Sequence, residues 1–267
     1  GTRTQKAIKF MGEVYRPLYI NETPIISTTV ETAEMIKYAA NAFLSLKISY
    51  INEIANLCEA VGADVQDVAR AMGLDGRISA KFLHPGPGYG GSCFPKDTHA
   101  LAATGQKNRS PLLTVEAAIK TNASQKVRMV DKLKRLIGGS FKGKTVAVLG
   151  LAFKPQTDDV REAASIVIVS NLAESGAAVQ AYDPIAMDNF KNHFPNIQYF
   201  NSWQDAVKNA DACILLTEWN EFRGMDLNKL KDLMKTPILL DTKNIISIQE
   251  LESRGFTYDN IGRKSPL

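Results

Sequence analysis

The chain has 267 residues, 45% of them hydrophobic, so it is long enough to bury the core of one large or two ordinary globular domains. Its 32 basic and 28 acidic residues give a net charge of +4 without a basic run, which argues against binding to nucleic acid or to a membrane. We expect a cytoplasmic protein without a metal site, because there is no signal-peptide pattern and no apolar stretch of ~18 residues, and because Cys58, Cys93 and Cys213 lie far apart.

Helical periodicity dominates the first half of the chain. Residues 4–15 predict an amphipathic helix, and the β-branched residues at 24–29 predict a strand. A single helix and strand do not make a sheet domain, so we interpret residues 1–29 as the remnant of a further domain. Apolar residues then recur every three or four positions over residues 31–61, which predicts one long helix, with Thr28 and Glu31 at capping-box spacing ahead of it.

Two further helices complete a central helical domain predicted over residues 30–137. Asp64 is placed to cap a helix that ends at Gly73, and another helix is predicted over residues 111–137. Between them, residues 84–91 hold too much glycine and proline for regular structure. Such a loop lets backbone amides approach a ligand closely.

The stretch Gly-Gly-Ser-Cys-Phe-Pro-Lys-Asp at residues 90–97 has the setting of a reactive thiol. Pro95 suits a first helical turn, so Cys93 falls at or beside the N-cap of a helix that continues to Gly105. Free backbone N–H groups, the helix dipole and the Lys96 ammonium would favour the thiolate, which is the nucleophilic form. The alternative is a buried structural cysteine, the usual role of a lone cysteine.

Three polar residues are candidates for a role beside this thiol. Lys37 and Asn41 stand four apart on the long helix and share a face. Aimed at Cys93, they would stabilise an oxyanion formed when a thiolate adds to a carbonyl. Asp97, one turn beyond Cys93, would act as a base or position a water. Lys37 also has a plain interpretation as a solvated charge, and Asp97 as a partner of the helix dipole.

After the glycines near residue 138, short β-branched runs alternate with helical segments. The predicted strands are residues 145–149, 178–182, 212–216 and 238–241, with a helix at 163–175. This pattern predicts an α/β fold in which a C-terminal, Rossmann-like, doubly wound parallel sheet (residues 138–267) follows the helical domain. The loop after the first strand lacks a G-x-G-x-x-G fingerprint, so we do not interpret the sheet as an NAD domain. Lys154 and Arg161 are candidates for meeting a diphosphate, or else solvated surface charges.

Several of these stretches together resemble the nucleotide-sugar dehydrogenases. The matching segments are residues 31–43, 81–91, 90–97 and 150–154, in the order in which the family has them. The resemblance extends over all 267 residues, but only to the central and C-terminal regions of the family. The family's N-terminal NAD-binding domain is absent except for its last helix and strand, so we expect the chain to be inactive alone.

The resemblance implies oxidation of a nucleotide sugar with NAD as the cofactor. Cys93 matches the nucleophile that captures an aldehyde at C6 as a thiohemiacetal, which a second oxidation converts to a thioester before water releases the acid. Lys37 and Asn41 match residues that stabilise the oxygen at C6, and Asp97 matches the residue that assists the water. Cys93, Lys96 and Arg161 match positions that touch NAD.

The resemblance also implies a set of substrate contacts. The matching positions are Arg77, Phe82, His84, Gly86, Gly88, Tyr89, Gly90, Phe153, Lys154 and Lys243. Arg77 resembles an arginine that reaches the substrate of a neighbouring subunit, which implies a homodimer through the long helix. At Lys243 the family usually has arginine, and lysine supplies the charge without the planar fork.

The choice among substrates follows from the same resemblance. The glycine-rich loop and the Phe94-Pro95 pair look most like the branch of the family that oxidises UDP-glucose. GDP-mannose and UDP-N-acetylhexosamine are the rival substrates within the family. A nucleotide-sugar binding module without redox activity and a thiol hydrolase are the alternatives outside it, and a hydrolase would need a histidine base among His84, His99 and His193.

Overall fold

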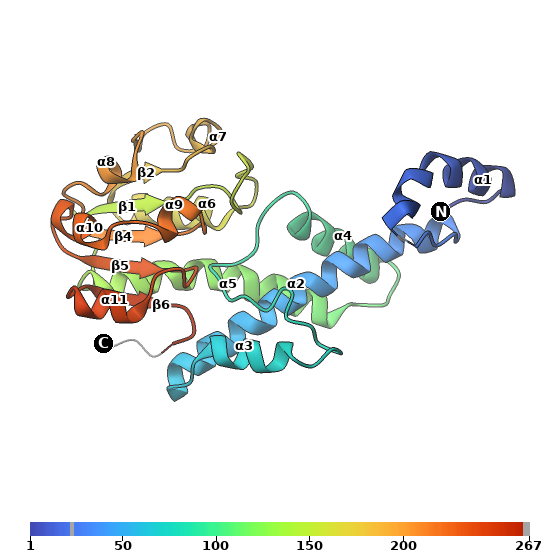
Figure 1. Cartoon of the computed structure of the whole chain (residues 1–267), viewed down its shortest axis with the longest axis horizontal. Helices are drawn as coiled ribbons and strands as arrows, with labels where there is room; N and C mark the ends of the chain where they lie inside the picture. Colours follow the sequence, from blue (N-terminus) through green and yellow to red (C-terminus); the bar gives the residue numbers. More distant parts are fainter. Residues whose placement is uncertain (22–23, 264–267) are drawn as a thin grey trace.

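The computed structural model describes residues 1–21 and 24–263, which form a helical part followed by a parallel sheet (Figure 1). The helical part contains α1 (Gln5–Val14), the 3₁₀-helix η1 (Arg16–Asn21), α2 (Val30–Val61), α3 (Val65–Gly73), α4 (Phe94–Lys107) and α5 (Leu113–Leu136). The strands are β1 (Thr145–Leu149), β2 (Ala178–Tyr182), β3 (Gln198–Tyr199), β4 (Ala212–Leu215), β5 (Ile238–Asp241) and β6 (Thr257–Asn260). The helices among them are α6 (Ala164–Glu174), α7 (Met187–Lys191), α8 (Trp203–Val207), α9 (Asn220–Arg223), α10 (Leu227–Leu233) and α11 (Ile248–Ser253). No helix of the described ranges combines the length and apolar character needed to cross a membrane.

The long helix α2 begins and ends on local signals in the sequence. Thr29 is its N-cap, and the Thr29 hydroxyl accepts a hydrogen bond from the Thr32 N–H at 3.2 Å. Gly62 follows the helix in the left-handed conformation (φ 77°), which glycine adopts without a Cβ penalty. The predicted helix is confirmed, whereas the capping pair predicted at Thr28 and Glu31 is wrong by one residue.

The strand predicted over residues 24–29 is wrong. These residues form no regular element, and α2 begins directly after them. A strand needs a neighbour that takes up its backbone N–H and C=O groups. No strand of the described residues lies beside this segment, and its backbone contact is a hydrogen bond from the Thr2 N–H to the Thr28 carbonyl at 3.1 Å. Composition alone therefore misled the prediction.

The six strands form one sheet in the order β3-β2-β1-β4-β5-β6, and all neighbouring strands are parallel. The chain moves outward from β1 to β3, returns to pair β4 with β1, and then moves outward on the other side. A sheet wound in this way binds ligands beyond the carboxyl ends of its strands. The predicted α/β fold, with a long central helix and a doubly wound parallel sheet, is confirmed.

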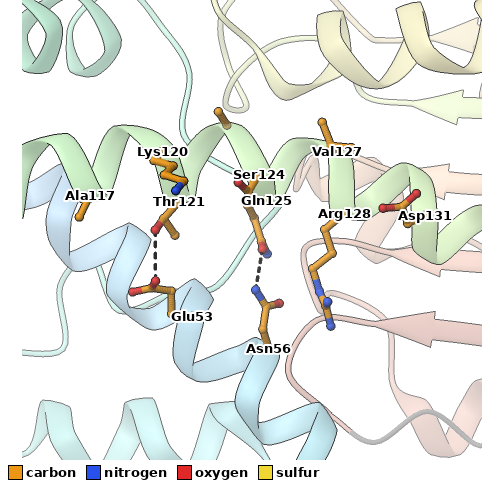
Figure 2. Close-up of a pocket in the computed structure, with 11 residues that line it drawn as sticks. Glu53, Asn56, Ala117, Lys120, Thr121, Ser124, Gln125, Val127, Arg128 and Asp131 are labelled. Carbon is orange, nitrogen blue, oxygen red and sulfur yellow. Dashed lines mark hydrogen bonds between the residues drawn. The ribbon is translucent and has the colours of Figure 1, made fainter.

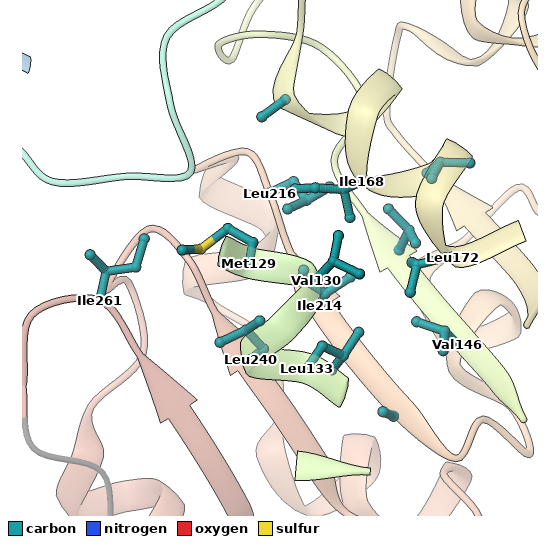
Figure 3. Close-up of a cluster of buried hydrophobic side chains, with 14 of the residues drawn as sticks. Met129, Val130, Leu133, Val146, Ile168, Leu172, Ile214, Leu216, Leu240 and Ile261 are labelled. Atoms are coloured by element: carbon teal, nitrogen blue, oxygen red, sulfur yellow. The ribbon is translucent and has the colours of Figure 1, made fainter. Parts of the chain in front are cut away.

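Alternate residues of the strands serve two hydrophobic cores, one on each face of the sheet. In β1, Val146 and Val148 belong to the core that contains α5 and α6 residues, whereas Ala147 and Leu149 belong to the core that contains α8 and α10 residues. Figure 3 shows the first of these cores, in which side chains of α5 and α6 meet those of the strands. Burial on both faces explains why the central strands are continuous apolar runs in the sequence.

Helix α5 packs in both parts of the molecule and joins them. It contacts α2 and α4 in the helical part and α6, β5 and β6 in the sheet part (Figure 1). Met129, Val130 and Leu133 of α5 lie in the core shown in Figure 3. The domain boundaries predicted at residues 29 and 137 stay predictions, and the buried part of α5 shows that the two parts share one element across the second of them.

A buried cluster of charges adds to this joint. The Lys132 side chain is 2% exposed, and its Nζ lies 2.9 Å from a carboxylate oxygen of Glu59 and 3.0 Å from one of Asp259. Arg128, one turn earlier on α5, pairs with the other oxygen of Glu59 at 2.6 Å. Burial raises the pKa of Glu59, but the Gly262 N–H and the two cations outweigh it, and the net shift is downward. Charges from α2, α5 and β6 therefore neutralise one another inside the molecule.

We expect Lys132→Met to destabilise the protein by about 3 kcal/mol, because it leaves the buried carboxylates of Glu59 and Asp259 without their shared cation. Urea denaturation followed by circular dichroism measures the change. Lys134→Met is the matched control, since Lys134 is exposed on the same helix. Equal midpoints for the two variants would show that the cluster contributes little to stability.

Candidate active site

Cys93 lies where the sequence predicts it, at the N-cap of α4. Pro95 occupies the first turn of that helix, and the Asp97 N–H donates to the Cys93 carbonyl at 2.9 Å. The Cys93 side chain is exposed and not disulfide-bonded, and its Sγ lies 3.8 Å from the Ser92 hydroxyl. A buried structural role for this thiol is therefore excluded, whereas Cys58 and Cys213 are buried.

The two glycines before Cys93 allow a close approach between the helical part and the sheet part. A Cβ on Gly90 would lie 2.5 Å from the Glu162 carbonyl oxygen, and a Cβ on Gly91 would lie 2.8 Å from the Phe153 ring. Gly91 also has φ +83°, which side chains rarely tolerate. Only glycine fits both positions, so this pair packs the segment before Cys93 against the chain that connects β1 to α6.

The residues on either side of Cys93 in the chain line two hollows. Gly90 and Phe94 line one hollow of about 440 Å³, and Gly91 and Ser92 line another of about 440 Å³. Both fall within the size range of small-molecule sites. Cys93 itself lines neither hollow, but it stands between Ser92 and Phe94 in the chain and therefore follows directly on residues of both linings.

The first hollow, called the loop-side hollow here, collects almost all the predicted substrate-binding residues. Its lining includes Phe82, His84, Gly86, Gly88, Tyr89, Gly90, Phe153, Lys154 and Lys243. These residues come from the glycine-rich loop, from the loop after β1 and from the segment after β5, so the hollow lies between the helical part and the carboxyl edge of the sheet. Arg77 is the exception, because its side chain is 89% exposed and pairs with Asp75 at 2.5 Å.

The second hollow, called the thiol-side hollow, contains the other predicted contacts. It is lined by Gly91, Ser92, Pro95, Lys96, His99, Arg161 and Glu162. The Arg161 guanidinium pairs with Asp159 at 2.7 Å, and this hydrogen bond raises the pKa of Arg161. Lys96 and Arg161, the residues predicted to touch a cofactor, therefore share one hollow beside Cys93.

Asp97 is the centre of a charged cluster beside the thiol. Its side chain is fully buried, and its two carboxylate oxygens accept hydrogen bonds from the Lys37 and Lys96 ammonium groups, one each. The Asn41 amide donates to the same oxygen as Lys37, at 2.5 Å. The structure thus brings all four predicted residues near Cys93 together, but Lys37 and Asn41 donate to Asp97.

This cluster changes the acidity of its members. Burial alone raises the pKa of Asp97, but the hydrogen bonds from Lys37, Lys96 and Asn41 outweigh burial and lower the pKa to about 2. The pKa of Lys96 is raised, first by its hydrogen bond to Asp97 and more weakly by the nearby Cys93 sulfur. Asp97 is therefore a carboxylate across the physiological pH range, with little tendency to take up a proton.

Three buried amide side chains, which the sequence analysis missed, hold the glycine-rich loop. The Asn52 carbonyl accepts from the Gly86 N–H at 2.8 Å, and the Gln125 amide donates to the Gly86 carbonyl at 3.0 Å. Asn122 binds the N–H and the carbonyl of Tyr89, at 2.7 and 3.1 Å. Polar residues on the otherwise apolar faces of α2 and α5 are the sequence signal that would have indicated them.

Glu218 is a further missed residue of the loop-side hollow. It follows β4, and its carboxylate pairs with the Lys243 ammonium at 2.7 Å. The two residues come from the ends of neighbouring strands, since Leu215 of β4 is opposite Asp241 of β5. The lining of the hollow therefore contains Lys243, whose charge Glu218 neutralises, in addition to Lys81 and Lys154.

A larger and more open hollow of about 880 Å³ lies between α2 and α5 (Figure 2). Glu53 and Asn56 of α2 face Thr121 and Gln125 of α5 there, joined by the hydrogen bonds drawn in Figure 2. None of the described residues that line it is a predicted site residue, so the larger volume of this hollow does not identify it as the active site.

Two segments of the chain match one enzyme family. Residues 31–124 match the central domain of the UDP-glucose/GDP-mannose dehydrogenase family, and residues 147–248 match its UDP-binding domain. The chain belongs to this family. The matched segments contain Cys93 and the residues around Asp97, as well as Phe153, Lys154 and Lys243, so the two hollows lie in the regions that define the family.

Individual relatives agree with this assignment. The chain is 51% identical over 258 residues to a UDP-glucose 6-dehydrogenase of Rhizobium meliloti (strain 1021), with 97% of this chain and 59% of that protein aligned. It is 47% identical to UDP-glucose 6-dehydrogenase TuaD of Bacillus subtilis (strain 168), with 98% and 56% aligned. The chain thus spans little more than half the length of these relatives.

Solved structures show the same relationship. A UDP-glucose dehydrogenase from the hyperthermophilic archaeon Pyrobaculum islandicum superposes with a TM-score of 0.88 at 31% identity, covering 98% of this chain and 58% of that one. A UDP-D-ManNAc dehydrogenase from Pyrococcus horikoshii superposes with a TM-score of 0.81 at 26% identity, covering 97% and 58%. The fold described above is therefore the fold of the family.

We expect Asp97→Asn to reduce stability by about 2 kcal/mol at pH 7, and by about half of that at pH 3. Folding lowers the pKa of Asp97 from 3.8 to about 2, so the stabilisation is fully present above pH ~4 and is lost as the pH falls toward 2. Salt should reduce the difference, because Lys37 and Lys96 are largely exposed.

Urea denaturation of both proteins at pH 7 and pH 3 measures this effect. A difference between the two proteins that stayed constant from pH 7 to pH 3 would contradict the ion-pair origin of the Asp97 contribution. Asp131→Asn serves as the control, because Asp131 is an exposed carboxylate of α5.

Proposed function

We propose that the full-length protein oxidises UDP-glucose to UDP-glucuronate with NAD, and that Cys93 is its nucleophile. The observation that carries this proposal is an exposed thiol at a helix N-cap, whose chain neighbours line both the hollow of the predicted substrate contacts and the hollow that contains Lys96 and Arg161. The names of the relatives at 47–51% identity support the reaction. The match to the UDP-binding domain supports the nucleotide.

The loop-side hollow has the chemistry that a UDP-sugar requires. Lys154 supplies positive charge for the diphosphate, and its ammonium lies 5.3 Å from the centre of the Phe153 ring, while Lys243 supplies N–H donors beside Glu218. Phe82 and Tyr89 supply aromatic surface, and the ring of Phe94 packs edge-on against both. A nucleotide placed there would point its sugar toward the segment that contains Cys93.

The thiol-side hollow fits the anionic part of NAD. Lys96, His99 and Arg161 face it, and cations of this kind bind diphosphates. When bound, NAD supplies the acceptor for one hydride in each of two oxidations of C6. Lys96 and Arg161 are the residues of this chain that would hold it, beside the thiol and across that segment from the sugar.

The remaining chemistry belongs to the residues of this chain. The Cys93 thiolate adds to the C6 aldehyde, so that a C–S bond forms and the oxygen takes up the electron pair and a proton. Loss of a hydride and a proton leaves a thioester. Water attacks the thioester, the C–S bond breaks, and the thiolate leaves with the electron pair. In total, one alcohol, one water and two oxidised cofactors give one carboxylate, two reduced cofactors and three protons.

Asp97 and its partners would bind the oxygen atoms that take part in these reaction steps. The lowered pKa of Asp97 suits an acceptor that orients a water more than a base that removes its proton. Lys37 and Asn41, held in place by Asp97, supply the donors for the charge that develops on the C6 oxygen. The carboxylate thus fixes the donors in advance, which is the condition for electrostatic stabilisation of a transition state.

A homodimer through α2 is the second part of the proposal. Ile36, Phe43, Tyr50 and Leu57 follow one another at seven-residue intervals along α2 and are all exposed, Phe43 by 61%. A stripe of this kind on a long helix is typical of a helix–helix contact between subunits. The exposed Arg77 side chain lies outside the loop-side hollow of its own chain, which suits a contact with the substrate of the partner.

We expect Cys93→Ser in the full-length protein to reduce NADH formation with UDP-glucose at least about 1,000-fold, because the serine hydroxyl does not form the thioester. Calorimetry should show UDP-glucose binding within about threefold of wild type, since Cys93 does not line the loop-side hollow. Ser92→Ala is the control for the neighbouring hydroxyl. Loss of folding in Cys93→Ser, or undiminished turnover, would contradict the nucleophile.

The same assay separates the alternatives. A binding module would bind UDP-glucose without producing NADH in the wild-type protein, and a dehydrogenase of the UDP-N-acetylhexosamine or GDP-mannose branch would turn over those substrates faster.

We expect Phe43→Glu to convert the dimer to a monomer, because it places a charge in the middle of the apolar stripe. Sedimentation velocity of the full-length protein measures the change. Glu34→Gln is the control, since Glu34 is exposed on the opposite side of α2. An unchanged sedimentation coefficient for Phe43→Glu would exclude this stripe as the interface.

A further inference from the structure

Lys126 of α5 is a buried cation without a carboxylate partner among the described residues. The residue is 6% exposed, and its ammonium donates to the Glu162 carbonyl at 2.9 Å. Burial lowers the pKa of Lys126, and the nearby Glu162 side chain offsets this only in part. A buried charge that is not neutralised by an ion pair destabilises a fold. The cost indicates that the Lys126–Glu162 contact serves a purpose other than stability.

The Glu162 carbonyl that accepts from Lys126 is also the surface against which Gly90 packs. A Cβ on Gly90 would lie 2.5 Å from this oxygen, and the Gly91 N–H donates to the preceding carbonyl, that of Arg161, at 2.8 Å. Glu162 itself has φ +54°, which is uncommon for a residue with a side chain and needs support from its surroundings. Lys126 provides that support through its hydrogen bond to the Glu162 carbonyl. This carbonyl packs against Gly90, which is three residues before Cys93 in the chain.

Helix α5 holds the other side of the same segment through Asn122. The Asn122 amide binds both backbone groups of Tyr89, and Asn122 stands one helical turn before Lys126 on the same face. Gly88 packs against both Asn122 and Lys126. A Cβ at this position would be 3.0 Å from the Asn122 side chain and 3.1 Å from that of Lys126. The chain from Gly88 to Gly91 is therefore confined between α5 and the Arg161–Glu162 turn.

We propose that Lys126 is a positioning residue for Cys93: by holding the Glu162 carbonyl under Gly90, it fixes the turn that sets the thiol between the two hollows. The same contact fixes the backbone of Arg161, so one ammonium aligns the thiol with the thiol-side hollow. Lys126 lines neither hollow among the described residues and acts through the Glu162 carbonyl. This role rests on the function proposed for Cys93.

The test is Lys126→Met in the full-length protein, which keeps the length of the side chain and removes the ammonium. We expect kcat for UDP-glucose oxidation to fall at least tenfold while KM for UDP-glucose changes less than threefold. Hydrogen-exchange mass spectrometry should show at least tenfold faster exchange in the peptide that contains residues 88–94. Lys126→Arg, which can donate to the same carbonyl, should recover part of kcat, and Lys134→Met should behave as wild type.

The outcomes separate the two proposals. A wild-type protein without turnover would overturn the proposed function, whereas an active wild type with unchanged kcat and unchanged exchange in Lys126→Met would overturn the role of Lys126. A lower urea midpoint with unchanged local exchange would also overturn it, because Lys126 would then be a general stabiliser. If Lys126→Met does not fold, Gly90→Ala tests the same contact from the other side, and wild-type kcat in that variant would overturn the proposal.

Discussion

The whole arrangement depends on α5 being shared between the helical part and the sheet. Met129 and Leu133 lie in the core of the sheet, while Asn122 binds the glycine-rich loop about two to three turns earlier on the same helix. Because a helix is stiff over this length, the loop is set at a fixed distance from the carboxyl edge of the sheet. The buried ion pairs of Lys132 then fix α2 and β6 against the same helix. The loop-side hollow is a consequence of this joint, since both parts contribute to its lining.

The parts of the fold that could be predicted are those determined by neighbours in the sequence. Gly62 ends α2 and Asp64 caps α3 because each needs only the residues next to it, and β1 is evident because burial on both faces makes it continuously apolar. Residues 24–29 have strand composition but no partner strand, and pairing is a tertiary property. The helices from α7 to α11 and the two-residue strand β3 are too short to show periodicity, and β6 ends in Asp259 and Asn260, which are residues that strands disfavour.

The residues of the candidate site also divide into those that local sequence predicts and those that it does not. The residues that would touch a ligand lie in contiguous motifs, such as the loop before Cys93, and a family resemblance finds them together. The residues that hold those motifs in place do not lie in contiguous motifs. Asn122 and Lys126 of α5 and Glu218 after β4 act on partners 25 to 36 positions away in the chain, at Tyr89, Glu162 and Lys243. Nothing local distinguishes them from solvated polar residues until the burial of α5 is known.

The electrostatics of the thiol explain why its surroundings contain more cations than one carboxylate neutralises. The Asp97 carboxylate neutralises one positive charge, but it pairs with two ammonium groups, those of Lys37 and Lys96. Within this cluster one positive charge therefore remains uncompensated, whereas Arg161 is neutralised by Asp159. In the reaction proposed here, addition of a thiolate to an aldehyde would move negative charge from sulfur to oxygen without changing its amount, so a fixed surplus of one positive charge would suit that step. The buried carboxylate is what keeps this surplus in place, since without it two mutually repelling lysines would turn toward water.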